Sequence, residues 1–299
     1  MNVLITGGTG FVGRHLADRF LGQGHAVTLL GSRSGNEKIC SRGCRTLQAD
    51  TTQPGDWQQA AADADLIVNL AGRTIFQRWS ESYKQQMHAS RIRTTQNLVD
   101  ALPGNRPVVL ISTSAVGYYG DGQDTVLSET APGGDDFLSR LCVDWEHVAL
   151  GAVAKGARVV LARFGIVLSA DGGALAKMLP GFRLFAGGPL GSGRQWFPWI
   201  HMADLLAAID FLAGRGDLSG AFNLCSPHPV RNRELAQTLG RTLGRPAILP
   251  APALALRLFM GEMAGVLLAG QRAVPERLMA AGFQFQYPRL DRALSDLLR

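Results

Sequence analysis

A glycine-rich turn near the start of the chain constrains the fold more than any other feature. Its residues, Thr6-Gly7-Gly8-Thr9-Gly10-Phe11-Val12-Gly13, follow a short apolar run and open a helical pattern. The spacing Gly7-x-x-Gly10-x-x-Gly13 lets the backbone turn sharply, approach a diphosphate without a Cβ in the way, and pack the helix closely on the strand. Free amides and the positive end of the helix then face the diphosphate. Between a strand and a helix, this triplet predicts a dinucleotide site. The alternative interpretation is a glycine-rich turn that binds nothing.

The first half of the chain alternates short apolar runs with helical patterns. We expect strands at 3–5, 26–30, 44–48, 66–70, 108–112 and 158–164, and helices at 11–21, 80–102 and 137–155. Apolar strands separated by helices predict a parallel sheet covered on both faces, and right-handed crossovers make it a Rossmann-type, doubly wound α/β sheet. We expect this domain to cover residues 1–165, with some later segments returning to it.

The second half is predicted to form a smaller mixed α/β substrate lobe over residues 166–299, with a small C-terminal domain at about 248–299. The glycine-rich, low-charge segment 165–198 predicts ordered loops and turns rather than packed elements. Helices are expected at 202–212 and 231–243. Apolar residues nearly surround the helical pattern of 252–270, which predicts a lobe core or a homodimer face.

The end of the second predicted strand indicates which dinucleotide binds. An NAD site places an acidic residue about 20 positions after the last glycine of the turn, to bind the ribose 2′-hydroxyl. This chain has Ser32-Arg33 at that position. A guanidinium and a hydroxyl suit a 2′-phosphate, so we predict NADP(H) as the cofactor. Arg33 could instead be a solvated loop residue.

Composition and charge exclude several classes of protein. The formal net charge of +6 is scattered, with no Lys/Arg block, which argues against nucleic-acid binding. Arg257 and Glu262 interrupt the longest apolar segment, so we predict no membrane span. Four cysteines are too few for a disulfide framework and lack metal-ligand spacing, which predicts reduced thiols and no metal site. Because the chain begins directly with a strand, we expect no signal peptide and a cytoplasmic location.

Several motifs resemble those of a known family. Asn69-Leu70-Ala71-Gly72 and Ser112-Thr113-Ser114-Ala115, together with the glycine turn, resemble the extended short-chain dehydrogenase/reductase superfamily. The segments 187–196, 199–201 and 220–224 and the tail 275–285 narrow this resemblance. They look like the atypical "epimerase family" subgroup, whose small C-terminal domain has no known function and some of whose members are loosely linked to cell division.

The resemblance implies where the cofactor lies. Leu70, Ala71 and Gly72 should lie beside the ribose, Asp50 near the adenine, and Arg163-Phe164-Gly165-Ile166 near the nicotinamide. All lie at the carboxyl ends of predicted strands, the edge at which such sheets bind ligands. The complete predicted cofactor site is Thr6, Gly7, Gly10, Phe11, Val12, Gly13, Ser32, Arg33, Asp50, Leu70, Ala71, Gly72, Ser112, Arg163, Phe164, Gly165 and Ile166.

The catalytic set departs from the superfamily. A Tyr-x-x-x-Lys pair normally supplies the proton donor and a fixed positive charge, but this chain has Leu138 and Cys142 at those positions, and Arg91 where a helical Asn is usual. Ser114 survives. Leu exchanges no proton and Cys carries no fixed positive charge, so the usual mechanism is absent.

Another proton donor is therefore needed for redox chemistry. Tyr118 or Tyr119, just after Ser114, could take the role, or could simply pack against the cofactor or lobe. His201 is a further candidate donor, although a lone His is more often a structural residue. Trp79, Gln195, Trp196 and Trp199 could wall the pocket of a small-molecule substrate, or form a core cluster between the lobes.

The sequence therefore favours an NADP(H)-dependent oxidoreductase that passes hydride to or from an unidentified small carbonyl or alcohol substrate. The alternative is a catalytically silent NADP-binding sensor or interaction protein. Sugar epimerisation is the weaker third hypothesis, because its proton shuttle normally needs the missing Tyr.

Overall fold

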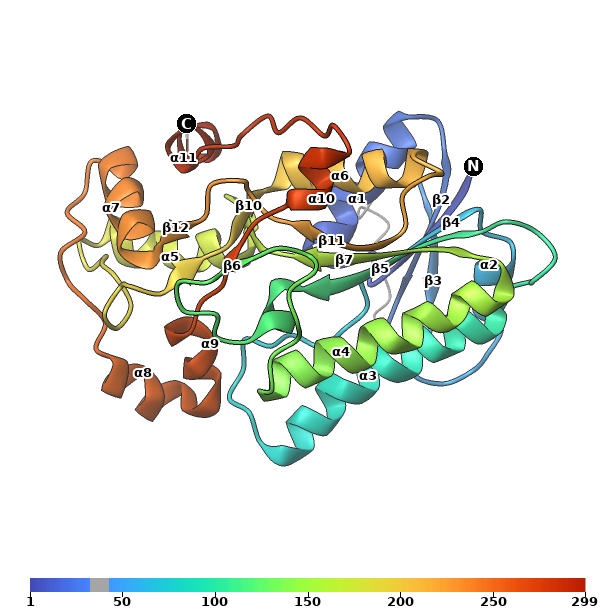
Figure 1. The fold of residues 1–299 in the computed structure, drawn as a ribbon, viewed down its shortest axis with the longest axis horizontal. Helices are drawn as coiled ribbons and strands as arrows, with labels where there is room; N and C mark the ends of the chain where they lie inside the picture. The colour runs from blue at the N-terminus through green and yellow to red at the C-terminus, as the bar shows by residue number, and fades with distance from the viewer. Residues whose placement is uncertain (33–42, 299) are drawn as a thin grey trace.

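A seven-stranded sheet forms the centre of the computed structural model, which describes residues 1–32 and 43–298 (Figure 1). The strand order is β11-β7-β5-β4-β1-β2-β3, and every neighbouring pair is parallel. The strands are β1 (Asn2–Thr6), β2 (Ala26–Gly31), β3 (Arg45–Gln48), β4 (Leu66–Asn69), β5 (Val109–Ala115), β7 (Arg158–Phe164) and β11 (Gly220–Leu224). The predicted α/β fold with a doubly wound parallel sheet is confirmed.

Helices cover both faces of this sheet, as Figure 1 shows. Val3 and Ile5 of β1 belong to a core that includes residues of α1 (Phe11–Gly22) and α6 (Met202–Gly214). Leu4, between them, points to the opposite core, which includes residues of α2 (Gln58–Ala62), α3 (Glu81–Ala101) and α4 (Phe137–Leu150). Since successive side chains of a strand point to opposite faces, a strand that is apolar throughout must be covered twice.

The strand order reverses at β1, which lies between β4 and β2. In open α/β sheets this reversal separates the connections above and below the sheet and opens a crevice at the carboxyl ends of the strands. The glycine-rich turn directly follows β1. The fold therefore places the turn at the position where such sheets bind ligands.

The second lobe contains packed elements where loops were predicted. β8 (Ile166–Ser169) and α5 (Gly173–Arg183) lie within the segment 165–198, and α5 buries Leu175, Leu179 and Phe182. The prediction of loops was wrong because these apolar positions at helical spacing outweigh the glycines, which only set where the helix begins. β8 pairs with β10 (Trp199–His201), and β9 (Trp196–Phe197) pairs with β12 (Val230–Arg231). α7 (Asn232–Leu243) and α11 (Leu290–Leu297) complete this core.

The expected apolar helix at 252–270 is divided. α8 (Ala253–Met260) and α9 (Ala264–Leu268) are separated at Gly261, whose φ of 61° favours glycine. α8 has no buried residue, so the expectation of a lobe core is wrong for α8. No helix within the described ranges is both long and apolar enough to span a membrane. β13 (Arg272–Ala273) then pairs with β6 (Val126–Leu127), and α10 (Glu276–Ala280) follows.

The cysteines differ from the prediction that all thiols are reduced. Cys44 is disulfide-bonded. Cys142 and Cys225 are free and buried.

Candidate functional site

The glycine-rich turn has the geometry that its spacing predicts. Gly7 has a φ of 64°, and a Cβ there would lie 2.8 Å from the carbonyl oxygen of Leu70, at the end of β4. A Cβ on Gly13 would lie 2.6 Å from the Cα of Gly8. The turn is thus packed against its own backbone and against β4, and only glycine fits these two positions.

The amino terminus of α1 is suited to an anion. The helix begins after Gly10, with no side-chain cap and no acidic residue in its first turn. The first amides of a helix have no partner within the helix, so they remain available to a ligand. Phe11, in this first turn, packs against the lobe: a Cβ on Gly172 would overlap its ring. Val12 beside it is half-buried. The turn can therefore hold the diphosphate of a dinucleotide.

The predicted adenosine side lies beyond β2 and β3. Ser32 is exposed after β2, and Arg33 lies outside the described residues. The carboxylate of Asp50 accepts hydrogen bonds from the hydroxyl and the amide of Thr52, at 2.6 and 3.0 Å. These bonds hold the pKa of Asp50 below its usual value. Asp50 is therefore an ionised acceptor at the edge where adenine is expected.

Buried hydroxyls fix the ends of the central strands. Thr6 donates to the amide oxygen of Asn69 at 2.6 Å, and the amide nitrogen of Asn69 donates to Thr95 at 2.9 Å and to Ser112 at 3.4 Å. Trp145 of α4 also donates to Thr95, at 2.8 Å. This series of hydrogen bonds connects β1, β4, β5, α3 and α4. The side chains of Thr6 and Ser112 are committed to it, and Leu70, Ala71 and Gly72 emerge beside it at the edge of the sheet.

Ser114 lies at the end of β5 against the thiol of Cys142. Its buried hydroxyl faces that thiol and makes no hydrogen bond to any other described residue. Burial raises the pKa of Cys142 to about 11, partly opposed by Ser114. Leu138, one turn earlier on α4, packs against the hydrophobic cluster formed by Tyr83, Met87 and Leu141. Leu138 has no proton to donate, and Cys142 is a neutral thiol near neutral pH that supplies no positive charge.

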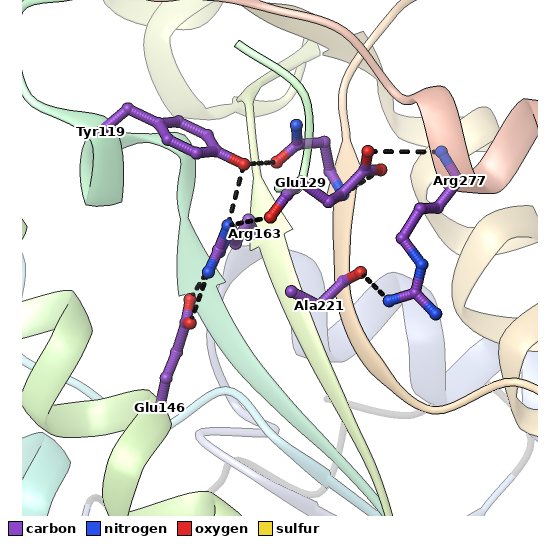
Figure 2. A network of polar contacts seen from close by, with 7 residues as sticks. Tyr119, Glu129, Glu146, Arg163, Ala221 and Arg277 are labelled. Atoms are coloured by element: carbon purple, nitrogen blue, oxygen red, sulfur yellow. Dashed lines mark hydrogen bonds and ion pairs between the residues drawn. The ribbon is translucent and has the colours of Figure 1, made fainter. Parts of the chain in front are cut away.

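Arg163 is buried in a network that spans the two halves of the chain (Figure 2). Its guanidinium pairs with both carboxylate oxygens of Glu146, each at 2.8 Å, and donates to the hydroxyl of Tyr119 at 2.9 Å. Burial alone would lower the pKa of Arg163, but Glu146 more than offsets this and raises it. The side chain of Arg163 is therefore committed to this network. At the end of β7, Phe164 and Ile166 are half-buried, and Gly165 is buried against Pro198.

The two tyrosines are engaged with this network. The hydroxyl of Tyr119 donates to Asn223 at 2.8 Å, and burial raises the pKa of Tyr119 to about 12. The ring of Tyr118 lies over Arg163, with 3.5 Å from Cζ to the ring centroid. Sequence reasoning missed Glu146 and Asn223. Glu146 had a signal, since it stands four positions after Cys142 and so shares its face of α4.

The network continues into the C-terminal region. Glu129 accepts from the backbone amides of Asn223 and Arg277, at 3.0 and 3.2 Å. Arg277 also donates to the carbonyl oxygen of Ala221 at 2.6 Å. These contacts fasten α10 to the edge strand β11 of the main sheet.

His201 lies in a structural position. Its Nδ1 accepts the amide of Ala203 at 3.0 Å and so caps α6. Its ring stacks on Tyr287, with centroids 4.0 Å apart, and Nε2 is 3.4 Å from the carboxylate of Asp296. Burial lowers the pKa of His201. All these partners come from α6 and the C-terminal segment, rather than from the strand ends that carry the turn and Ser114.

The four predicted pocket residues do not form one cluster. Trp79 packs on Phe137, with ring centroids 5.4 Å apart, at the start of α4. Gln195 donates to two backbone carbonyls, of Leu190 and Leu267, and thereby ties a loop to α9. Trp196 is half-buried, whereas the Trp199 ring has no exposed surface. Trp79 and Trp196 therefore retain surface that a substrate could contact, and Trp199 is part of the core.

Comparisons with known proteins agree with this geometry. Residues 3–225 match the model of the NAD dependent epimerase/dehydratase family, and residues 251–297 match DUF1731, a domain of unknown function. The chain is 42% identical to the chloroplastic "epimerase family protein SDR39U1 homolog" of Arabidopsis thaliana, over 100% of this chain and 87% of that protein. It is 40% identical to epimerase family protein SERP0438 of Staphylococcus epidermidis, over 99% and 98%.

A solved structure is also similar over its whole length. The human epimerase family protein SDR39U1 (isoform 2), crystallised with NADPH, is 36% identical, with a TM-score of 0.87 and 99% of each chain covered.

Proposed function

The chain belongs to the NAD dependent epimerase/dehydratase family, and from that premise we propose that it is an NADP(H)-dependent oxidoreductase of the atypical epimerase-like type. The observation that carries the proposal is the glycine-rich turn at the switch point of the sheet, whose uncapped helix amides offer donors to a diphosphate. The NADPH in the similar human structure supports the choice of nucleotide.

The residues present fit a bound dinucleotide. Gly7 and Gly13 allow the turn to pack tightly on β4 and on its own backbone, which is the shape that a diphosphate-binding turn needs. The residue after β2, where a 2′-phosphate would lie, is Ser32 rather than an acidic residue. Bound NADPH would supply the hydride. The hydroxyl of Ser114 would donate a hydrogen bond to the reacting carbonyl oxygen, and the segment 163–166 would line the nicotinamide.

Nucleotide preference is tested by calorimetry with NADPH and NADH. We expect NADPH to bind more tightly than NADH. We expect Arg33→Ala to weaken the binding of NADPH and to leave the binding of NADH unchanged. Loss of the 2′-phosphate contact removes a charge-assisted hydrogen bond, so the expected effect is roughly tenfold. Tighter binding of NADH, with no effect of Arg33→Ala, would reject the NADP assignment.

A second candidate function is an NADP-binding sensor or interaction protein that does not turn over. It is favoured by the state of the candidate donors: Tyr119 and His201 are held in other contacts, and Tyr118 is stacked on Arg163. Absorbance of NADPH in the presence of aldehydes, ketones and quinones separates the two. Oxidation with any of them supports the enzyme and rejects the sensor, whereas nucleotide binding without oxidation by the panel favours the sensor.

A further inference from the structure

A positively charged side chain lies between the carboxyl ends of β4 and β5. It is Arg91 of α3, whose guanidinium sits so close to Gly72 that a Cβ there would lie 2.9 Å from Arg91 Cζ. On its other side Arg91 faces α4, with Cζ 5.2 Å from the ring centroid of Trp145.

The charge of Arg91 has no counter-ion in the part of the chain that the structure describes. None of the ion pairs there includes Arg91. Its terminal nitrogens donate to two neutral backbone carbonyls, of Met87 at 3.2 Å and of Arg73 at 3.0 Å. A half-buried cation without a carboxylate is costly unless a ligand provides further acceptors. Its remaining N–H groups are available for such a ligand.

The strand order indicates which part of a dinucleotide would lie there. The diphosphate turn follows β1, and the predicted adenosine residues Ser32 and Asp50 follow β2 and β3, on one side of it. β4, β5 and β7 lie on the other side. Arg91, at the ends of β4 and β5, therefore lies on the side of the nicotinamide ribose.

Arg91 lies where it could replace the positive charge of the Lys that this chain lacks. Cys142 stands at the Lys position and is a neutral, buried thiol. We propose that Arg91 is a positioning residue for the nicotinamide ribose, supplying from α3 the fixed positive charge that the superfamily takes from a Lys on α4. The inference rests on the proposed NADP(H) binding.

The test compares two ligands that share the adenosine half. NADPH carries the nicotinamide ribose, and adenosine 2′,5′-bisphosphate lacks it. Calorimetry is performed on the full wild-type chain and on Arg91→Ala, Arg91→Gln and Arg93→Ala. Gln keeps an N–H donor for the backbone carbonyls without the charge, which provides a second variant if Ala does not fold. Arg93 is an exposed residue of the same helix and serves as the matched control.

We expect the Arg91 variants to bind NADPH about tenfold more weakly and the bisphosphate as tightly as wild type, because only a charge-assisted contact to the nicotinamide half is lost. Arg93→Ala should bind both ligands like wild type. Equal weakening of both ligands, or an Arg91→Gln variant that binds NADPH like wild type, overturns the inference. If the wild-type chain binds neither ligand, the proposed function itself fails.

Discussion

Replacing Gly13 with Ala tests the central packing contact of the glycine-rich turn. On helix propensity alone, Ala is more stable than Gly within a helix by about 1 kcal/mol. In this structure, however, the new Cβ would lie 2.6 Å from both the Cα and the carbonyl oxygen of Gly8. Gly8 cannot retreat, since a Cβ placed on it would already lie 2.7 Å from Leu29 and 2.8 Å from the Ile5 oxygen.

The expected magnitude follows from these two opposing terms. Overpacking against rigid backbone costs about 1–3 kcal/mol, toward the upper end where nothing can yield. Subtracting the propensity gain leaves a net loss of about 1–2 kcal/mol in the free energy of unfolding. Relief of the clash moves the start of α1 away from β1, so at least one amide contact to the diphosphate should be lost. The affinity for NADPH should therefore fall roughly tenfold.

Gly181→Ala provides the matched control. Gly181 lies inside α5, and a Cβ there would meet no atom within 4 Å. Propensity then acts alone, and we expect a gain of about 0.5–1 kcal/mol. Urea unfolding measures both variants, and calorimetry measures their affinity for NADPH. If Gly13→Ala stabilised the protein as Gly181→Ala does and bound NADPH normally, the packing argument for the turn would be refuted.

Two further substitutions test the buried charge network and the helix cap. Glu146→Ala leaves the guanidinium of Arg163 buried without its carboxylate and should cost about 3–5 kcal/mol in urea unfolding, whereas Asp217→Ala, in an exposed pair with Arg215, should change the free energy of unfolding far less. Equal costs would show that burial of the pair is unimportant. Burial holds the pKa of His201 below 6.5, so its contribution to stability is present above about pH 6.5 and is lost as the pH falls through the folded-state pKa. His201→Asn keeps a capping acceptor without the titration and should therefore flatten the fall in stability between about pH 7.5 and about pH 5.5; an unchanged slope would assign that fall to other groups.

Local features of the chain were enough to predict the main sheet. The predicted strand at 26–30 is observed at Ala26–Gly31, and the predicted helix at 80–102 at Glu81–Ala101. Apolar periodicity is a property of neighbouring residues and needs no distant partner. It failed at 165–198, where the glycines outweighed the apolar positions of α5 in the interpretation, and at 252–270, where Gly261 divides one apolar pattern into two helices.

In the candidate site, too, the local features could be predicted from the sequence and the contacts between distant residues could not. Thr6-Gly7-Gly8-Thr9-Gly10 and the absence of Tyr-x-x-x-Lys are visible in the sequence, because the turn and the missing pair each lie within a few consecutive residues. The partners of Arg163 come from α4 and from the turn after β5, and Arg91 reaches Gly72 from a different element. Which charges are paired depends on distances between residues far apart in the chain. The sequence therefore determined where a diphosphate can be held, and only the tertiary structure decided that Arg163 is neutralised by Glu146 while Arg91 is left without a described counter-ion.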